Sequence, residues 1–137
     1  MRRWLWVILG LVLFAAACIT DRIGRRVVPG ELADGWWEGE ASSFPNSALV
    51  LVAVQAGRIV DVELVAHGGS WIGHRADRAI PTRMVEQQSS AVDAVTGATN
   101  SSHVIMNAAE AALEKSRAAA TQPPNSQPTV SPRLKSP

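Results

Sequence analysis

Two apolar segments separated by a short turn constrain the fold of this chain most strongly. Residues Ala48–Val54 form a continuous apolar run with strong β propensity, which suits a strand covered on both faces. Residues Gln55–Arg58 then form a turn, and Ile59–Ala66 alternates in polarity. The alternation places Val60, Val62 and Leu64 on one face of the second strand and Asp61 and Glu63 on the other. The pattern predicts an antiparallel hairpin.

The segments on either side of this hairpin predict a small α+β domain. Residues Trp36–Ser42 favour a first strand, and Ala91–Val95 favours a short extended segment. A helix is expected over Arg75–Glu86, interrupted or bent near Pro81. From Ser102 to about Arg117, apolar residues recur at helical spacing. We therefore expect an antiparallel β-meander packed with helices.

The two ends of the 137-residue chain fall outside this domain. Residues Met1–Ala17 combine a basic start, an apolar run and closing alanines, as in a secretory signal. The apolar run also reaches the lower length limit of a membrane helix. Residues 18–31 are expected to form a linker, and residues 32–118 the folded domain. Residues 119–137 are rich in proline, serine and glutamine, and are expected to be a disordered tail.

Cys18 is the only cysteine and directly follows the predicted signal. It therefore cannot form an intramolecular disulfide or a cysteine-based metal cluster. Its position resembles that of the acylated cysteine of bacterial lipoproteins, although Ala15 stands where leucine is usual. Cys18 is thus a candidate lipidation site, with an uncleaved membrane anchor or a freely secreted product as alternatives. All three place the domain outside the cytoplasm unless the anchor is inverted, and arginines on both sides of the apolar run leave its orientation open.

A hydroxyl-rich loop from Asp93 to Ser102 precedes the last predicted helix. Gly97 can adopt backbone conformations closed to other residues and Ala98 adds little bulk, so a large ligand or a modifying enzyme can approach the backbone. Free N–H groups at a helix N-terminus favour a phosphate. The hydroxyls beside that terminus are those of Thr96, Thr99, Ser101 and Ser102. The same composition also suits a plain turn and N-cap, so both interpretations stay open on composition alone.

The loop from Asp93 to Ser102 reads Asp-Ala-Val-Thr-Gly-Ala-Thr-Asn-Ser-Ser and resembles the flavinylation motif of the FMN-binding domain family. That family includes the C subunit of sodium-translocating NADH:quinone reductase and the G subunit of the related Rnf complex. Supporting similarity lies upstream, in family order, over Asp34–Glu40, Gly57–Val62 and Pro81–Ser89. The resemblance runs from Leu32 to Lys115.

The resemblance implies that Thr99, the last threonine of the motif, carries FMN through a phosphoester bond. It also implies that a magnesium-dependent flavin transferase donates this FMN from FAD and releases AMP. Asp93 would serve recognition or positioning, and Gly97 and Ala98 would leave room for the cofactor. The implied cofactor-binding residues are Asp93, Thr96, Gly97, Ala98, Thr99, Ser101 and Ser102.

Few other residues suggest a chemistry of their own. His67, His74 and His103 lie in different local contexts, without cysteine partners or His-Glu-x-x-His spacing, so no metal site is expected. His67 is expected to be a surface histidine, with an approach to the flavin as the alternative. Trp71, in a glycine-rich loop, is a candidate for stacking on the flavin ring. No catalytic constellation is readable, and a net charge of +1 argues against a nucleic-acid partner.

These features favour an electron carrier over an independent enzyme. We expect a membrane-associated protein on the extracytoplasmic face of the cell membrane, whose FMN exchanges electrons with a membrane redox donor and a separate acceptor. The expected partners are these two, the flavin transferase and the membrane. The alternatives are a small flavin-dependent reductase module and a binding lipoprotein of the same fold without covalent flavin.

Overall fold

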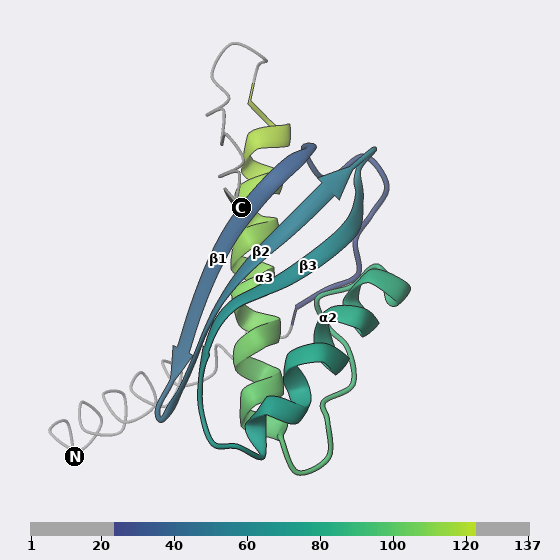
Figure 1. Ribbon diagram of the computed structural model, residues 1–137. Coiled ribbons are helices and arrows are strands. Elements are labelled where there is room, and N and C mark those ends of the chain that lie inside the picture. The colour runs from purple at the N-terminus through teal and green to yellow at the C-terminus, as the bar shows by residue number, and fades with distance from the viewer. Residues whose placement is uncertain (1–23, 123–137) are drawn as a thin grey trace, which may run out of the picture.

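A computed structural model describes residues 24–122, and these form a three-stranded antiparallel sheet with helices on one face (Figure 1). The strands β1 (Gly35–Ser43), β2 (Asn46–Gln55) and β3 (Arg58–Gly68) pair in the order β1-β2-β3. A short 3-10 helix, η2 (Gly73–Arg75), leads into α2 (Ala76–Gln87) and then α3 (Thr99–Ala120). The predicted α+β class and the meander are therefore confirmed.

The core lies between the sheet and α3, which runs along β1 and β2 (Figure 1). Val50 and Val52 of β2 are fully buried against the helices. The helices contribute Ile80 and Met84 from α2, and Val104, Ile105, Ala108, Ala112 and Leu113 from α3. Alternate residues of a strand face opposite sides, and on the other side of β2 Leu49 and Leu51 are only half-buried. The expectation that this strand is covered on both faces is thus wrong within the described residues.

Two irregularities in β3 change which of its residues face the core. The pairing between β2 and β3 shifts at Leu49/Val50 and at Ala53/Val54, which leaves Val65 and Val60 as the extra residues of two bulges. A bulge interrupts the alternation of a strand, so Val60 and Val65 are exposed while Val62 is buried. The sequence-based assignment of Val60 to the same face as Val62 is therefore wrong.

Helix α3 is longer than the sequence pattern suggests, whereas α2 has the expected length and is shifted by one residue. Helix α2 continues through Pro81, which replaces one backbone N–H but leaves the flanking turns helical. Helix α3 begins at Thr99, one turn before the expected start at Ser102, and continues to Ala120. Residues Ala91–Val95 form no strand. The earlier start of α3 moves Thr99 from the loop into the first helical turn.

Gly39 of β1 lies in close contact with α3. A Cβ atom at this position would lie 1.9 Å from the carbonyl oxygen of Ala108 and 2.5 Å from the backbone nitrogen of Ala112. Only a residue without a side chain fits such a contact. Gly39 therefore sets the distance between β1 and α3.

The residues before β1 pack against the domain. The backbone N–H of Val27 donates to the carbonyl of Gln88, Arg26 forms a bridge with Ser89, and Val27 and Leu32 are buried. The part of the expected linker that the structure describes is thus held in place. The predicted signal or anchor, Cys18 and the tail from residue 123 onward lie outside the described residues. Between residues 24 and 122, no helix is both long and apolar enough to cross a membrane.

Candidate functional site

The hydroxyl-rich loop ends at the N-terminus of α3. The backbone N–H of Ala98 donates to the carbonyl of Val95, and Gly97 in this turn has a φ of +82°, a conformation that favours glycine. The N-cap residue of α3 is Ala98, which has no side-chain oxygen to accept a hydrogen bond from the first turn. The first N–H groups of a helix have no partner within the helix, so this end suits an anionic ligand.

Ser102 holds the loop against this helix end. Its buried hydroxyl accepts a hydrogen bond from the Val95 backbone N–H at 3.0 Å and donates one to the Ala98 carbonyl at 2.8 Å. Both contacts are internal to the protein. Ser102 therefore stabilises the conformation of the loop from within the protein.

Replacing Ser102 with alanine is expected to lower the free energy of unfolding by about 1–2 kcal/mol, because the Val95 N–H loses its acceptor in a part-buried place. Urea denaturation followed by circular dichroism measures this difference. Ser42→Ala, at an exposed position of β1, is the matched control and should remain within about 0.5 kcal/mol of the wild type. Equal stability of the two variants would show that Ser102 does not hold the loop.

Three segments that are distant in the sequence enclose a hollow beside Thr99. The hollow has a volume of about 390 Å³, within the usual range for small-molecule sites of roughly 300–1,000 Å³. Its lining comes from the β1–β2 turn, the connection between β3 and α2, and the start of α3: Pro45, Asn46, Ser70, Gly73, Gly97, Ala98, Thr99, Asn100 and Ser101. A Cβ atom at Gly73 would lie 2.3 Å from Ser101 Oγ, so the second and third segments touch.

The structure brings together four of the seven residues named from the motif. Gly97, Ala98, Thr99 and Ser101 line the hollow, and the Thr99 residue is exposed. The remaining three are Asp93, Thr96 and Ser102. Asp93 and Thr96 are exposed outside the lining, and Arg83 donates a hydrogen bond to the Asp93 backbone carbonyl.

Two large, exposed aromatic residues adjoin lining residues of the hollow in the sequence. Phe44 is 98% exposed and precedes Pro45, and Trp71 is 81% exposed and follows Ser70. Trp37, by contrast, packs against the core and donates from Nε1 to the Ala33 carbonyl. Exposed aromatic groups next to a concave surface are typical of a binding site.

A cluster of two histidines and an aspartate lies behind one wall of the hollow. Asp77 Oδ1 is 2.7 Å from His67 Nδ1, and Asp77 Oδ2 is 2.7 Å from His74 Nδ1. The His67 side chain is 2% exposed, so it is not the surface histidine that the sequence suggested. His103 lies apart on the exposed face of α3. Sequence spacing could not predict the contact between His67 and Asp77, because it depends on how the loop after β3 and η2 bring α2 back toward the end of β3.

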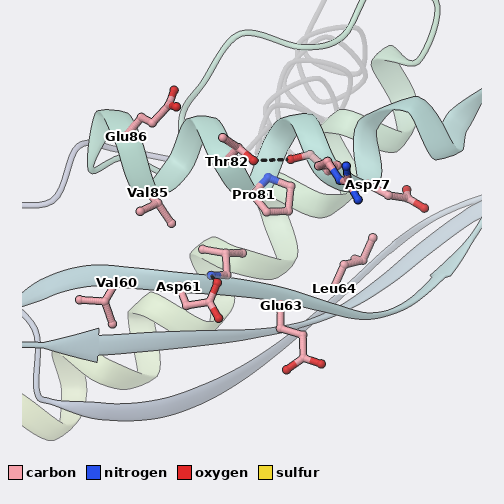
Figure 2. Close-up of a pocket in the computed structure, with 11 residues that line it drawn as sticks. Val60, Asp61, Glu63, Leu64, Asp77, Pro81, Thr82, Val85 and Glu86 are labelled. Carbon is pink, nitrogen blue, oxygen red and sulfur yellow. Dashed lines mark hydrogen bonds between the residues drawn. The ribbon is translucent and has the colours of Figure 1, made fainter.

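A larger hollow of about 880 Å³ lies between β3 and α2. Figure 2 shows Pro81 and Val85 pointing from α2 toward β3 and Leu64 pointing from β3 toward α2, while Glu63 and Glu86 point away from the gap. None of the motif residues lines this hollow. It is therefore separate from the hollow that contains Thr99.

Comparison with known proteins identifies the class of this domain. Residues 47–114, from the second strand to the middle of α3, match the family described as the FMN-binding domain. This stretch includes the whole hydroxyl-rich loop and Thr99. The chain therefore carries a domain of the FMN-binding domain family, and it is a flavin-binding protein.

Two known proteins resemble this chain, one in sequence and one in fold. An uncharacterized protein of Treponema pallidum (strain Nichols) is 31% identical over 96 residues, which cover 66% of this chain. The matched part is only 26% of that relative, so this chain spans about a quarter of its length. The crystal structure of the CPE2226 protein from Clostridium perfringens shares the fold with a TM-score of 0.53, at 21% identity, over 64% of this chain and 90% of that protein.

The chemistry of the Thr99 hollow fits FMN. The uncapped N-terminus of α3 suits its phosphate, the glycines at 73 and 97 keep side chains out of the approach, and the exposed rings of Phe44 and Trp71 suit a flat aromatic ring system. The larger hollow has four carboxylates in its lining, those of Asp61, Glu63, Asp77 and Glu86, and their negative charge suits a phosphate poorly.

Proposed function

We propose that this protein is an extracytoplasmic, membrane-associated electron carrier whose FMN is bound covalently to Thr99. The observation that carries the proposal is the position of Thr99. It is the first residue of α3, exposed in a hollow whose helix end lacks a side-chain cap. A phosphodiester at that position would accept hydrogen bonds from the backbone N–H groups of the first turn. The helix dipole would also stabilise its negative charge.

The proposed attachment transfers FMN, through its phosphate, from FAD to Thr99. The Oγ of Thr99 forms a bond to the phosphorus on the FMN side of FAD, the pyrophosphate bond breaks, and AMP leaves. The hydroxyl proton passes to a base of the flavin transferase, because a threonine hydroxyl is a poor nucleophile without an activating partner. This chain supplies an exposed hydroxyl and open space around Gly97, where a Cβ atom would meet nothing within 4 Å.

Flavin bound in this way accepts and donates electrons singly or in pairs. The chain's own contribution is to fix the flavin and to shape its surroundings. In this proposal Trp71 and Phe44, which adjoin lining residues of the hollow, pack on the flavin ring, and the Ser102 contacts hold the loop against the helix end that carries Thr99. Thr99 and both aromatic residues are exposed, an arrangement that suits electron exchange with a partner protein.

The location outside the cytoplasm rests on the first 18 residues of the sequence. A signal of the kind seen in Met1–Ala17, followed by Cys18, would export the domain and anchor it by a lipid. A covalent bond then has a clear advantage, since free FMN lost from an exported protein is not readily replaced. Membrane attachment also keeps the carrier near a membrane redox donor.

Electron transfer is tested with purified flavinylated protein and membranes of the host under anaerobic conditions, following flavin absorbance. The flavin should be reduced by membranes supplied with NADH or quinol and reoxidised by an added acceptor. Thr99→Ala protein, handled identically, is the control without covalent flavin. Flavin that stays oxidised with every membrane donor, yet turns over a small substrate with an artificial reductant, would identify a reductase instead.

A further inference from the structure

Three side chains of types that commonly bind metal ions lie close together at the junction of β3, η2 and α2. His67 comes from the end of β3, His74 from η2 and Asp77 from the first turn of α2. One ligand atom from each residue lies within 4.8 Å of the others. We propose that this cluster, the His67–His74–Asp77 site, binds a divalent transition-metal ion.

The donor set selects the class of ion. Two imidazole nitrogens and one carboxylate suit zinc and other first-row transition metals, whereas magnesium and calcium prefer oxygen ligands alone. Three protein ligands leave at least one coordination position for water. The side chains of His74 and Asp77 are 52% and 31% exposed, so the ion can enter from their side, while His67 closes the site from the interior.

A bound ion must replace two hydrogen bonds, one from each histidine Nδ1 to the Asp77 carboxylate. An ionised carboxylate only accepts hydrogen bonds, so both Nδ1 atoms facing Asp77 carry protons in the metal-free protein. When an ion binds through Nδ1, each of these hydrogen bonds is replaced, and the ring coordinates as a neutral imidazole whose proton has moved to Nε2.

The two histidine–aspartate distances require only a small adjustment. In the cluster, each Nδ1 lies 2.7 Å from an oxygen of Asp77. Ligands of a tetrahedral zinc ion lie about 3.3 Å apart, from metal–ligand bonds of about 2.0–2.2 Å. His74 and Asp77 can move outward by this difference because neither side chain is closely packed. The buried His67 can stay in place.

The His67–His74–Asp77 site lies next to the hollow that contains Thr99. A Cβ atom at Gly73 would be 3.6 Å from His67 Cε1 on one side and 2.3 Å from Ser101 Oγ on the other. Gly73 thus separates the His67 ring from the helix turn that contains Thr99. An ion that joins β3 to η2 and α2 would fix the wall of the hollow formed by Gly73.

The test is a calorimetric titration of the full chain with Zn²⁺. All proteins carry Cys18→Ser, which removes the one thiol that could bind zinc. We expect one ion per chain. His74→Ala and Asp77→Asn should each weaken binding at least tenfold, whereas His103→Ala, which removes a histidine outside the cluster, should leave it unchanged.

His74→Ala is the decisive variant because its side chain is half-exposed, so its thermal unfolding without metal should match that of the parent. Absence of zinc binding, binding of equal affinity in His74→Ala, or equal affinity for Mg²⁺ would overturn the proposal. The titration is repeated on Thr99→Ala, which carries no covalent flavin. Zinc binding should be the same there, so failure of the flavin proposal and failure of the metal proposal are separate outcomes.

Discussion

Replacing Thr99 with alanine is expected to abolish covalent flavin attachment, a complete loss of the flavin fluorescence that survives denaturing electrophoresis. The reason is chemical, because alanine has no hydroxyl to form the phosphoester. The fold should survive, since Thr99 is exposed and its side chain caps nothing in the core. The measurement is co-expression of the full chain with a flavin transferase, followed by in-gel fluorescence.

Two variants within the same loop serve as controls for Thr99. Thr96→Ala removes an exposed hydroxyl three residues away that does not line the hollow, and it should keep the fluorescent band. Thr99→Ser restores a hydroxyl at the helix N-terminus and should recover part of the labelling. A fluorescent Thr99→Ala protein, or loss of the band in Thr96→Ala alone, would place the flavin on another residue.

Replacing Gly39 with alanine is expected to destabilise the domain by about 3 kcal/mol or more. Alanine in a strand normally gains roughly 0.5–1 kcal/mol over glycine. Here the added carbon would lie 1.9 Å from the Ala108 carbonyl oxygen, so β1 and α3 must separate. The steric cost outweighs the gain.

Chemical denaturation of Gly39→Ala is best compared with that of Gly30→Ala. Gly30 has a φ of +83° but no atom within 4 Å of an added Cβ, so alanine there brings strain without a clash. We expect a loss of about 1 kcal/mol for Gly30→Ala. If Gly39→Ala were the more stable of the two variants, the close packing of β1 on α3 would be wrong.

Local sequence patterns were sufficient to predict the hairpin, the helices and the α+β class. Each depends on the polarity of residues close in sequence, as in the run Ala48–Val54 and the helical spacing after Ser102. Element ends and irregularities were harder. The bulges at Val60 and Val65 arise from pairing with β2, and the helix start at Thr99 depends on the Ser102 hydroxyl bonding to Val95 and Ala98.

The candidate site also has one part that the sequence predicts and another that it does not. Gly97–Ser101 is one continuous motif, so the sequence could point to it directly. Asn46 and Gly73, which complete the hollow, come from segments with no shared pattern. The pairing of His67 with Asp77 also depends on how the chain returns after β3. Such contacts follow from tertiary packing, which no short window of sequence contains.

Mass spectrometry of the protein purified from its native host tests the flavin assignment most directly. After proteolysis, the peptide that contains Thr99 should have the added mass of one FMN less one water, and fragmentation should place that mass on Thr99. The intact mass of the same sample also reports whether Met1–Ala17 has been removed. An unmodified Thr99 peptide, or FMN on any other residue, in cells that contain an active flavin transferase would contradict the account.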